Sequence, residues 1–269
     1  MPHPGLLDFF SRSGSAQEAI SAISQGRMPA LLAGAQGYAR TFYLGTVYRQ
    51  ISRPMVVVYS RPEEAVTSRR DLGDLIGHDR VLLFPSREVM PFEAAQGNRE
   101  SLWIRVSCLY ELLRGHKDDG PYVVLMPATA LLRKLMPAHS FRDGCIRLNV
   151  GTKLLPEELV RKLVNYGYER VSSVEAKGEL ALRGGILDVF PPIADHPYRV
   201  EFFYDEVDSI RGFDPETQVS THMLDEAFLS PATDYIQAGY VPPGHVTAYD
   251  NPGKYDGTTI LEYFPETPL

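Results

Sequence analysis

The chain lacks the residues on which several classes of protein depend. It has 269 residues but only two cysteines, Cys108 and Cys145, which are too few for a disulfide framework and suit a reducing compartment. Its seven histidines show no ligand spacing, so we expect no metal site. No apolar stretch approaches the length of a transmembrane helix, and no signal peptide is visible. These absences favour a cytoplasmic protein without a membrane anchor.

Positive charge is also scarce, and its distribution is uneven. The net charge is −7. Residues 1–140 hold 16 lysines and arginines against 13 acidic residues, whereas residues 141–229 hold 10 against 16. A dedicated nucleic-acid-binding module would usually show a basic balance. The middle segment is therefore more typical of a protein-docking surface than of a DNA clamp.

Hydrophobic residues make up 44% of the chain, and in its first part they alternate between two patterns. Short β-branched or aliphatic runs predict buried strands, and periodic stretches between them predict helices. The predicted strands lie within residues 30–33, 55–59, 81–84 and 122–126, and the predicted helices within 41–50 and 99–113. Alternating strands and helices predict an α/β layer with a mostly parallel sheet.

A different pattern begins near residues 137–141. Pro156 opens a predicted short helix with acidic residues in its first turn, and Gly167 closes it. Strand-like stretches follow at 186–190, 199–203 and 207–211, with a hairpin expected at Asp205-Glu206. We therefore expect two domains, an α/β domain over residues 1–140 and an inserted α+β domain over 141–230. Residues 231–269 would begin a further part that continues beyond the end of the chain.

One segment looks like a damaged phosphate-binding loop. It runs from Gly34 to Thr41, between a predicted strand and a predicted helix, and includes Gly37. A working loop reads G-x-x-x-x-G-K-[S/T], but here Ala39 replaces the second glycine and Arg40 replaces the lysine. Ala39 adds a Cβ where the backbone would wrap a phosphate, and a planar guanidinium does not replace a compact ammonium. An active ATPase, a relic loop and a chance glycine turn are the three interpretations; we favour the relic and expect no hydrolysis.

Motifs spread along the chain carry a resemblance to a known family. The first is the segment at 33–42, and the next is FPSREVMPFE at 84–93, followed by the helix from Arg99. The most specific is GELALRGGILDVFP at 178–191, which continues as YRVEFF and DEVDSIRGFD up to residue 214. With these motifs the chain resembles the N-terminal module of the bacterial transcription-repair coupling factors (Mfd), which is similar to the excision-repair helicase UvrB.

The resemblance implies both a fold and a function. It implies a RecA-like parallel-sheet domain, part 1a with a degenerate P-loop, over 1–140, and a UvrB-type domain 2 over 141–230 that docks the damage-recognition protein UvrA. The start of part 1b, truncated, would span 231–269. Regions that bind RNA polymerase and DNA, and a translocase that uses ATP and magnesium, would lie beyond Leu269. This chain would then catalyse nothing and hold no cofactor, whereas its parent would be an ATP-dependent DNA translocase.

The resemblance also implies docking residues, which we assign by matching sequence positions to those of the family. Arg183 matches an arginine that UvrB-type domains use against UvrA, Arg170 aligns with another, and Ala181 stands where UvrB has a third. The remaining predicted docking residues are Phe190, Arg199, Glu201 and Phe203. Strand alternation puts the last three on one face, with Val200 and Phe202 on the other. In the alternative interpretation the arginines are solvated charges that contribute little, and Phe190 is a core residue.

The main hypothesis is a non-catalytic docking module that recruits UvrA, and with it nucleotide excision repair, to stalled RNA polymerase. A first alternative is an ATP-dependent, UvrB-like helicase subunit that binds damaged DNA. Ala39, Arg40 and the acidic middle segment argue against it. A second is a latch, in which the module folds back on the C-terminal part of its parent and masks the docking face.

Overall fold

The computed structural model describes residues 4–27, 31–86, 99–115, 121–235, 257–264 and 268. The chain divides into two compact units. Unit 1 comprises Met1–Arg87, Arg114–Arg133 and Phe264–Leu269, and unit 2 comprises Glu88–Leu113 and Lys134–Tyr263. Most of the FPSREVMPFE motif, from residue 87 on, lies outside the described residues.

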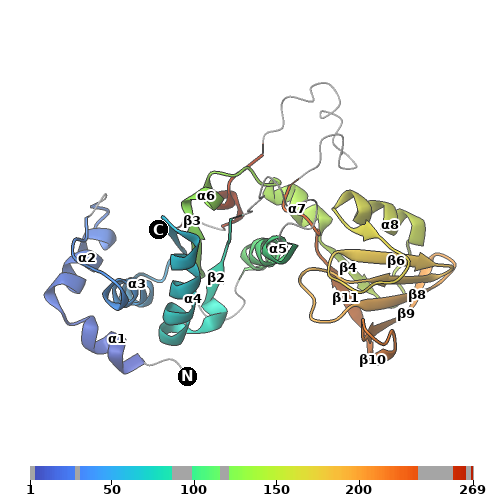
Figure 1. Cartoon of the computed structure of the whole chain (residues 1–269), viewed down its shortest axis with the longest axis horizontal. Helices are drawn as coiled ribbons and strands as arrows, with labels where there is room; N and C mark the ends of the chain where they lie inside the picture. Colours follow the sequence, from blue (N-terminus) through green and yellow to red (C-terminus); the bar gives the residue numbers. More distant parts are fainter. Residues whose placement is uncertain are drawn as a thin grey trace. The chain divides into compact units, whose positions relative to one another are not determined.

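Unit 1 is built on a three-stranded parallel sheet (Figure 1). Its strands are β1 (Met55–Tyr59), β2 (Val81–Leu83) and β3 (Val123–Pro127), in the order β1-β3-β2. Every residue of the central strand β3 is buried, as its apolar run on both faces requires. The parallel sheet predicted from these three runs is confirmed.

The helices of unit 1 are α1 (Pro4–Phe10), α2 (Gly14–Ser24), α3 (Tyr38–Ile51), α4 (Pro62–Ile76) and the short α6 (Ala128–Leu131), with a 3₁₀ turn at His78–Arg80. Of these helices, α4 and α6 pack on the sheet, whereas α3 packs on α4, and α1 and α2 pack on α3. Sequence reasoning did not predict α4, although Pro62 stands in its first turn with Glu63 and Glu64 beside it. Its Ala65 and Leu72 are fully buried.

The strand predicted at residues 30–33 is wrong for the part that the structure describes. Residues 31–33 form no regular structure, and Leu31 is 95% exposed; Ala30 lies outside the described residues. A run of four apolar residues does not specify a pairing partner, and a strand is stable only when a neighbour hydrogen-bonds to it. Among the described residues, the segment at Gly34 therefore lacks the preceding strand that a phosphate-binding loop requires.

Unit 2 contains a six-stranded sheet in the order β10-β9-β8-β7-β6-β5. Its strands are β5 (Glu169–Arg170), β6 (Glu179–Arg183), β7 (Ile186–Val189), β8 (Tyr198–Phe203), β9 (Glu206–Phe213) and β10 (Ser220–Leu224). Only the β5–β6 pair is parallel; the other pairs are antiparallel. The hairpin expected after β8 forms, with its turn at Tyr204-Asp205, one residue earlier than predicted.

Further elements of unit 2 complete its core. They are α5 (Arg99–Arg114, all but its last residue), α7 (Ala138–Gly144), α8 (Pro156–Asn165), a two-stranded sheet of β4 (Ile146–Asn149) and β11 (Glu226–Leu229), and a 3₁₀ helix at Ile260–Tyr263. In the described residues no helix is both long and apolar enough to cross a membrane.

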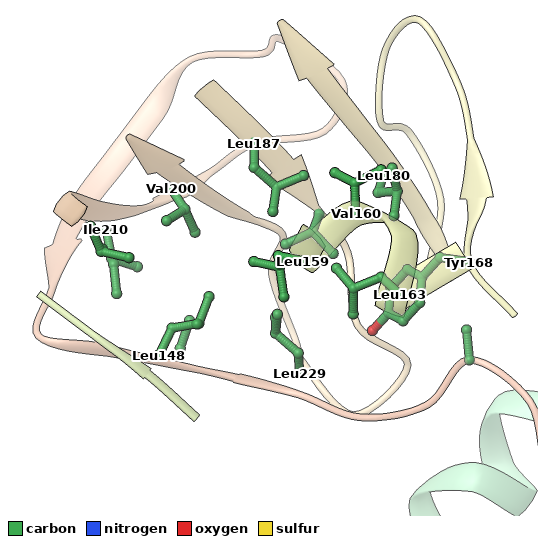
Figure 2. Packing of buried hydrophobic residues seen from close by; sticks show 14 residues of the cluster. Leu148, Leu159, Val160, Leu163, Tyr168, Leu180, Leu187, Val200, Ile210 and Leu229 are labelled. Atoms are coloured by element: carbon green, nitrogen blue, oxygen red, sulfur yellow. The ribbon is translucent and has the colours of Figure 1, made fainter. Parts of the chain in front are cut away.

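The main core of unit 2 lies between α8 and one face of the six-stranded sheet. Leu159, Val160 and Leu163 of α8 point toward Leu180 and Leu187 of the sheet (Figure 2). Pro156 begins the helix and Gly167, at φ 94°, follows its end, as predicted. Burying a leucine of this kind contributes about 2 kcal/mol, so this one helix face provides much of the stability of the unit.

The opposite face of the sheet carries a smaller apolar cluster and most of the charge. The cluster is formed by Val174, Ala181, Phe190 and Phe213. Val200 and Phe202 belong to the α8 core, whereas Arg199 lies over the Phe213 ring. The alternation predicted for β8 is therefore confirmed, although the pairing with β9 shifts between Glu201 and Phe202.

Candidate docking surface

A buried carboxylate organises the charged face of the sheet in unit 2. Asp188 of β7 is only 1% exposed and pairs in register with Arg199 of β8. Arg183 Nη2 donates to its Oδ2 at 2.6 Å. Arg199 donates from Nε to Oδ1 at 2.7 Å and from Nη2 to Oδ2 at 3.0 Å. One buried acid thus holds two arginines that the sequence placed in the docking set.

The two arginines differ in what they leave accessible. Arg199 also donates to the Gln218 carbonyl at 3.1 Å and stacks over Phe213 at 4.6 Å, so little of its side chain reaches solvent. The hydrogen bond with Asp188 raises the pKa of Arg199 further above its ordinary value. The side chain of Arg183 is 54% exposed. Arg199 is consequently an internal anchor, whereas Arg183 presents donors to the surface.

Glu201 and Phe203 extend this face along β8. Glu201 accepts from Ser209 Oγ at 2.8 Å and from Arg211 Nη2 at 3.1 Å, so its carboxylate is already partnered. Phe203 is 69% exposed and meets Tyr204 edge to face, with ring centroids 4.8 Å apart. Phe203 is thus the aromatic of the predicted set that faces solvent.

Phe190 and Ala181 lie beneath the charged face rather than on it. Both are buried in the small apolar cluster, and Lys177 Nζ lies 5.8 Å from the centre of the Phe190 ring. Ala181 is the residue that stands where UvrB has its third arginine. Its side chain fills an apolar position here, which suits a methyl group and leaves no charge to present.

Arg170 lies on the other side of the sheet from Arg183. It pairs in parallel register with Leu180, which faces the α8 core, whereas Val171 packs on the opposite face. Arg170 lines an open groove of about 660 Å³ beside α8 that Arg161 also borders. The structure therefore places both arginines near β6 but does not bring them together on one face.

The candidate phosphate loop in unit 1 precedes α3. Gly34 and Gly37 adopt positive φ angles of 80° and 54°, the conformation for which glycine is suited. Thr41 is buried inside the first turn of α3. Arg40 lies 4.9 Å from the centre of the Tyr59 ring, so the residue in the lysine position is directed toward the end of β1.

Carboxylates surround the space next to Arg40. A hollow of about 340 Å³ is lined by Arg40 and Arg61 together with Glu63, Glu64 and Asp71. Arg40 Nη1 lies 3.6 Å from Glu64 Oε2. A triphosphate in this hollow would meet more negative than positive side chains, and its charge would be repelled.

Among the described residues, a metal site would need a cluster of ligands, and the thiol of Cys145 would need a low pKa to act as a nucleophile. No group of three or more histidine, cysteine or acidic residues there could hold a metal ion. Burial raises the pKa of the Cys145 thiol to about 12, so the thiol stays protonated at neutral pH and is a poor nucleophile.

Comparison with known proteins assigns a large part of unit 2. Residues 146–235 match the family model of the UvrB interaction domain. The match covers the six-stranded sheet, α8 and the β4–β11 pair. Residues 146–235 form a UvrB interaction domain. The charged face around Asp188 is thus part of this domain.

Most of the chain, including its UvrB interaction domain, is similar to transcription-repair-coupling factors. The factor of Bacillus subtilis is 31% identical over 231 residues, which cover 86% of this chain and 19% of that protein. Those of Staphylococcus haemolyticus and Myxococcus xanthus are 33% and 34% identical over 78% and 76% of this chain. The chain is a relative of these factors and spans less than a fifth of their length, which confirms the resemblance seen in its motifs.

Sequence reasoning missed two residues that shape the charged face of the UvrB interaction domain. Asp188 interrupts the apolar run Ile186–Val189, and a polar residue inside a buried strand is a signal of a paired charge. Its partners depend on the pairing of β7 with β6 and β8, which the sequence does not give. Tyr204, at the tip of the β8–β9 hairpin, is the second residue that was missed. Its left-handed backbone, with φ 57°, is set by the fold and has no signal in the local sequence.

Proposed function

We propose that this chain is a non-catalytic docking module of a transcription-repair coupling factor. Its UvrB interaction domain would bind UvrA and so bring nucleotide excision repair to RNA polymerase stalled at a lesion. The observation that carries the proposal is Arg183, a half-exposed arginine that a buried carboxylate holds in place on a UvrB interaction domain. Arg170, on the groove side of the same sheet edge, would supply a second cationic contact.

The geometry suits a protein partner for a physical reason. An arginine presents several donors in a planar fork, and the Asp188 contact fixes one side of that fork. Less side-chain entropy is then lost when the remaining donors bind a carboxylate on the partner. Because arginines and aromatics dominate interface energetics, Arg183 and Phe203 are the members of the set that we expect to contribute most.

Unit 1 would serve as a scaffold. We assign residues 1–140 to a RecA-like part 1a with a degenerate P-loop, 141–230 to the docking domain and 231–269 to the start of part 1b. The carboxylates around Arg40 support the relic interpretation of the loop over the ATPase interpretation. Translocation on DNA and binding of RNA polymerase would belong to regions of the parent protein outside this chain.

Binding to purified UvrA tests the proposal. Isothermal titration should show binding by the unaltered chain and a loss of at least about tenfold with Arg183→Ala, because a fork of donors is removed at a preorganised site. The double variant Arg183→Ala with Arg170→Ala should bind UvrA still more weakly. Arg61→Ala is the matched control, since Arg61 is also an exposed arginine paired with a carboxylate but lies in unit 1. Absence of binding would refute the function, and unchanged affinity in the double variant would refute the site.

A further inference from the structure

The tip of the β8–β9 hairpin presents two aromatic rings to solvent. Phe203 ends β8, and Tyr204 follows it in the turn with 83% of its surface exposed. The rings contact each other edge to face, and this contact limits their mobility. Large exposed aromatics in a preset geometry are the residue type that anchors protein interfaces.

The backbone at Tyr204 makes this exposure unusual. Its φ of 57° lies in the left-handed region, where a residue with a Cβ is disfavoured by roughly 1–2 kcal/mol. Hairpin turns ordinarily use glycine, asparagine or aspartate at such positions. Burial does not offset the strain, since the ring is mostly in water. Backbone strain at exposed residues clusters at binding and functional sites, which makes Tyr204 a candidate contact residue.

A neighbouring loop, residues 150–155, is hydrogen-bonded to the tip. Leu154 N donates to the Asp205 carbonyl at 2.7 Å, and Val207 N donates to the Thr152 carbonyl at 2.9 Å. These bonds align the loop with the first residues of β9. The loop has exposed apolar side chains of its own, at Val150 and Leu155. The aromatic pair therefore stands on a turn that a second segment holds by hydrogen bonds, rather than on a free loop end.

The tip is continuous with the face that carries Arg183. Phe202 N donates to the Gly185 carbonyl at 2.7 Å, so the turn after Arg183 adjoins the end of β8. Ile186, which begins β7 and is partly exposed, pairs in register with Arg183 and Glu201. Arg183 and the aromatic pair therefore lie at the same end of the sheet.

The charges around the tip indicate what it binds. Three exposed acidic residues, Asp205, Glu206 and Asp208, follow the aromatic pair, and Lys153 pairs with Glu206 through a backbone β-bridge. We propose that Phe203 and Tyr204 insert into an apolar pocket of the docking partner whose rim carries lysines or arginines. The inference rests on the proposed function, because it takes UvrA as that partner and adds an aromatic contact beside Arg183.

Titration of UvrA against tip variants tests the inference. Tyr204→Gly should weaken binding at least about tenfold without lowering the midpoint of thermal unfolding, because glycine relieves the strained backbone as it removes the ring. Tyr204→Phe should bind like the unaltered chain. Tyr38→Ala is the matched control, since Tyr38 is likewise an exposed tyrosine but lies in unit 1. Glu206→Gln should reduce the salt dependence of the association rate.

The outcomes separate the inference from the function on which it rests. If Tyr204→Gly binds UvrA with unchanged affinity while Arg183→Ala binds it more weakly, the aromatic contact is refuted and the docking function stands. If Tyr204→Gly loses binding together with thermal stability, Tyr204 supports the fold and the inference is overturned. If Tyr204→Phe also loses binding, the ring is not what the partner takes up, and the inference is likewise overturned. If the unaltered chain does not bind UvrA, both proposals fail.

Discussion

Asp188 is the residue on which the charged face of the UvrB interaction domain depends. A carboxylate at 1% exposure would be strongly destabilising without partners, and here it accepts three hydrogen bonds from Arg183 and Arg199. Arg199, which is mostly buried, depends on Asp188 in turn. The pair is thus a structural unit from which Arg183 extends to the surface.

Replacing Asp188 should damage both stability and docking. Asp188→Asn keeps the shape but removes the negative charge, which leaves Arg199 nearly buried without its counterion. We expect a loss of about 2–4 kcal/mol in the free energy of unfolding. Urea titration followed by the fluorescence of Trp103, the single tryptophan, measures it, because Trp103 lies in the same unit beside Gly178.

The control for Asp188 is Asp208→Asn on strand β9 of the same sheet. Asp208 is exposed, so its replacement should change the free energy of unfolding by less than about 0.5 kcal/mol. Equal effects of the two substitutions would show that the buried charge pairing does not stabilise the sheet, and would remove the basis for a preorganised Arg183.

Helix α8 is the element that holds the UvrB interaction domain together. Its sequence PEELVRKLVN places four apolar residues, Leu159, Val160, Leu163 and Val164, at helical spacing. In the structure Leu159, Val160 and Leu163 are buried, whereas Val164 is exposed and borders the groove of Arg170. The width of the buried stripe is set by how the helix lies on the sheet, not by the periodicity.

Two adjacent positions of α8 provide a direct test of this packing. Leu163→Ala should cost about 2–5 kcal/mol of unfolding free energy, because it leaves a cavity at a fully buried site. Val164→Ala should change it by less than about 0.5 kcal/mol. Denaturant unfolding of both variants, followed through Trp103, compares them. Similar losses would mean that α8 rotates on the sheet relative to the structure described.

The charges of unit 1 and of the whole chain are unfavourable for binding a nucleotide. Unit 1 contains the segment that resembles a phosphate loop, yet acidic side chains line the hollow beside Arg40. The net charge of −7 further disfavours polyanions. Both features are unfavourable for a nucleotide-dependent helicase, and they agree with a role in protein docking.

Nucleotide titration tests this view of unit 1. Isothermal titration with ATP and magnesium should give no binding heat, because carboxylates occupy the surroundings of the would-be phosphate site. The double substitution Ala39→Gly with Arg40→Lys should also fail to bind, since it restores the motif but not the preceding strand or the charge. Magnesium chloride alone is the control titration. Micromolar affinity in the unaltered chain would revive the ATPase alternative.

Local sequence was enough to specify the most regular elements and the family. Strongly periodic or β-branched runs gave the parallel strands β1, β2 and β3 and the faces of β8, because their apolar spacing allows few other arrangements. Pro156 and Gly167 marked the ends of α8 through their backbone preferences alone. The motif around Arg183 carried the likeness to coupling factors that the comparisons confirm.

The composition of the charged face was decided only in three dimensions. Strand register joins Asp188 to Arg183 and Arg199, buries Phe190, and separates Arg170 from Arg183, and register depends on pairings between residues distant in the sequence. The exposed run at Leu31 and the strained turn at Tyr204 are likewise set by the surrounding fold. The sequence alone determined which residues are available to bind a partner, and the tertiary structure decided which of them reach its surface, because hydrogen-bonded pairing and burial involve the whole sheet.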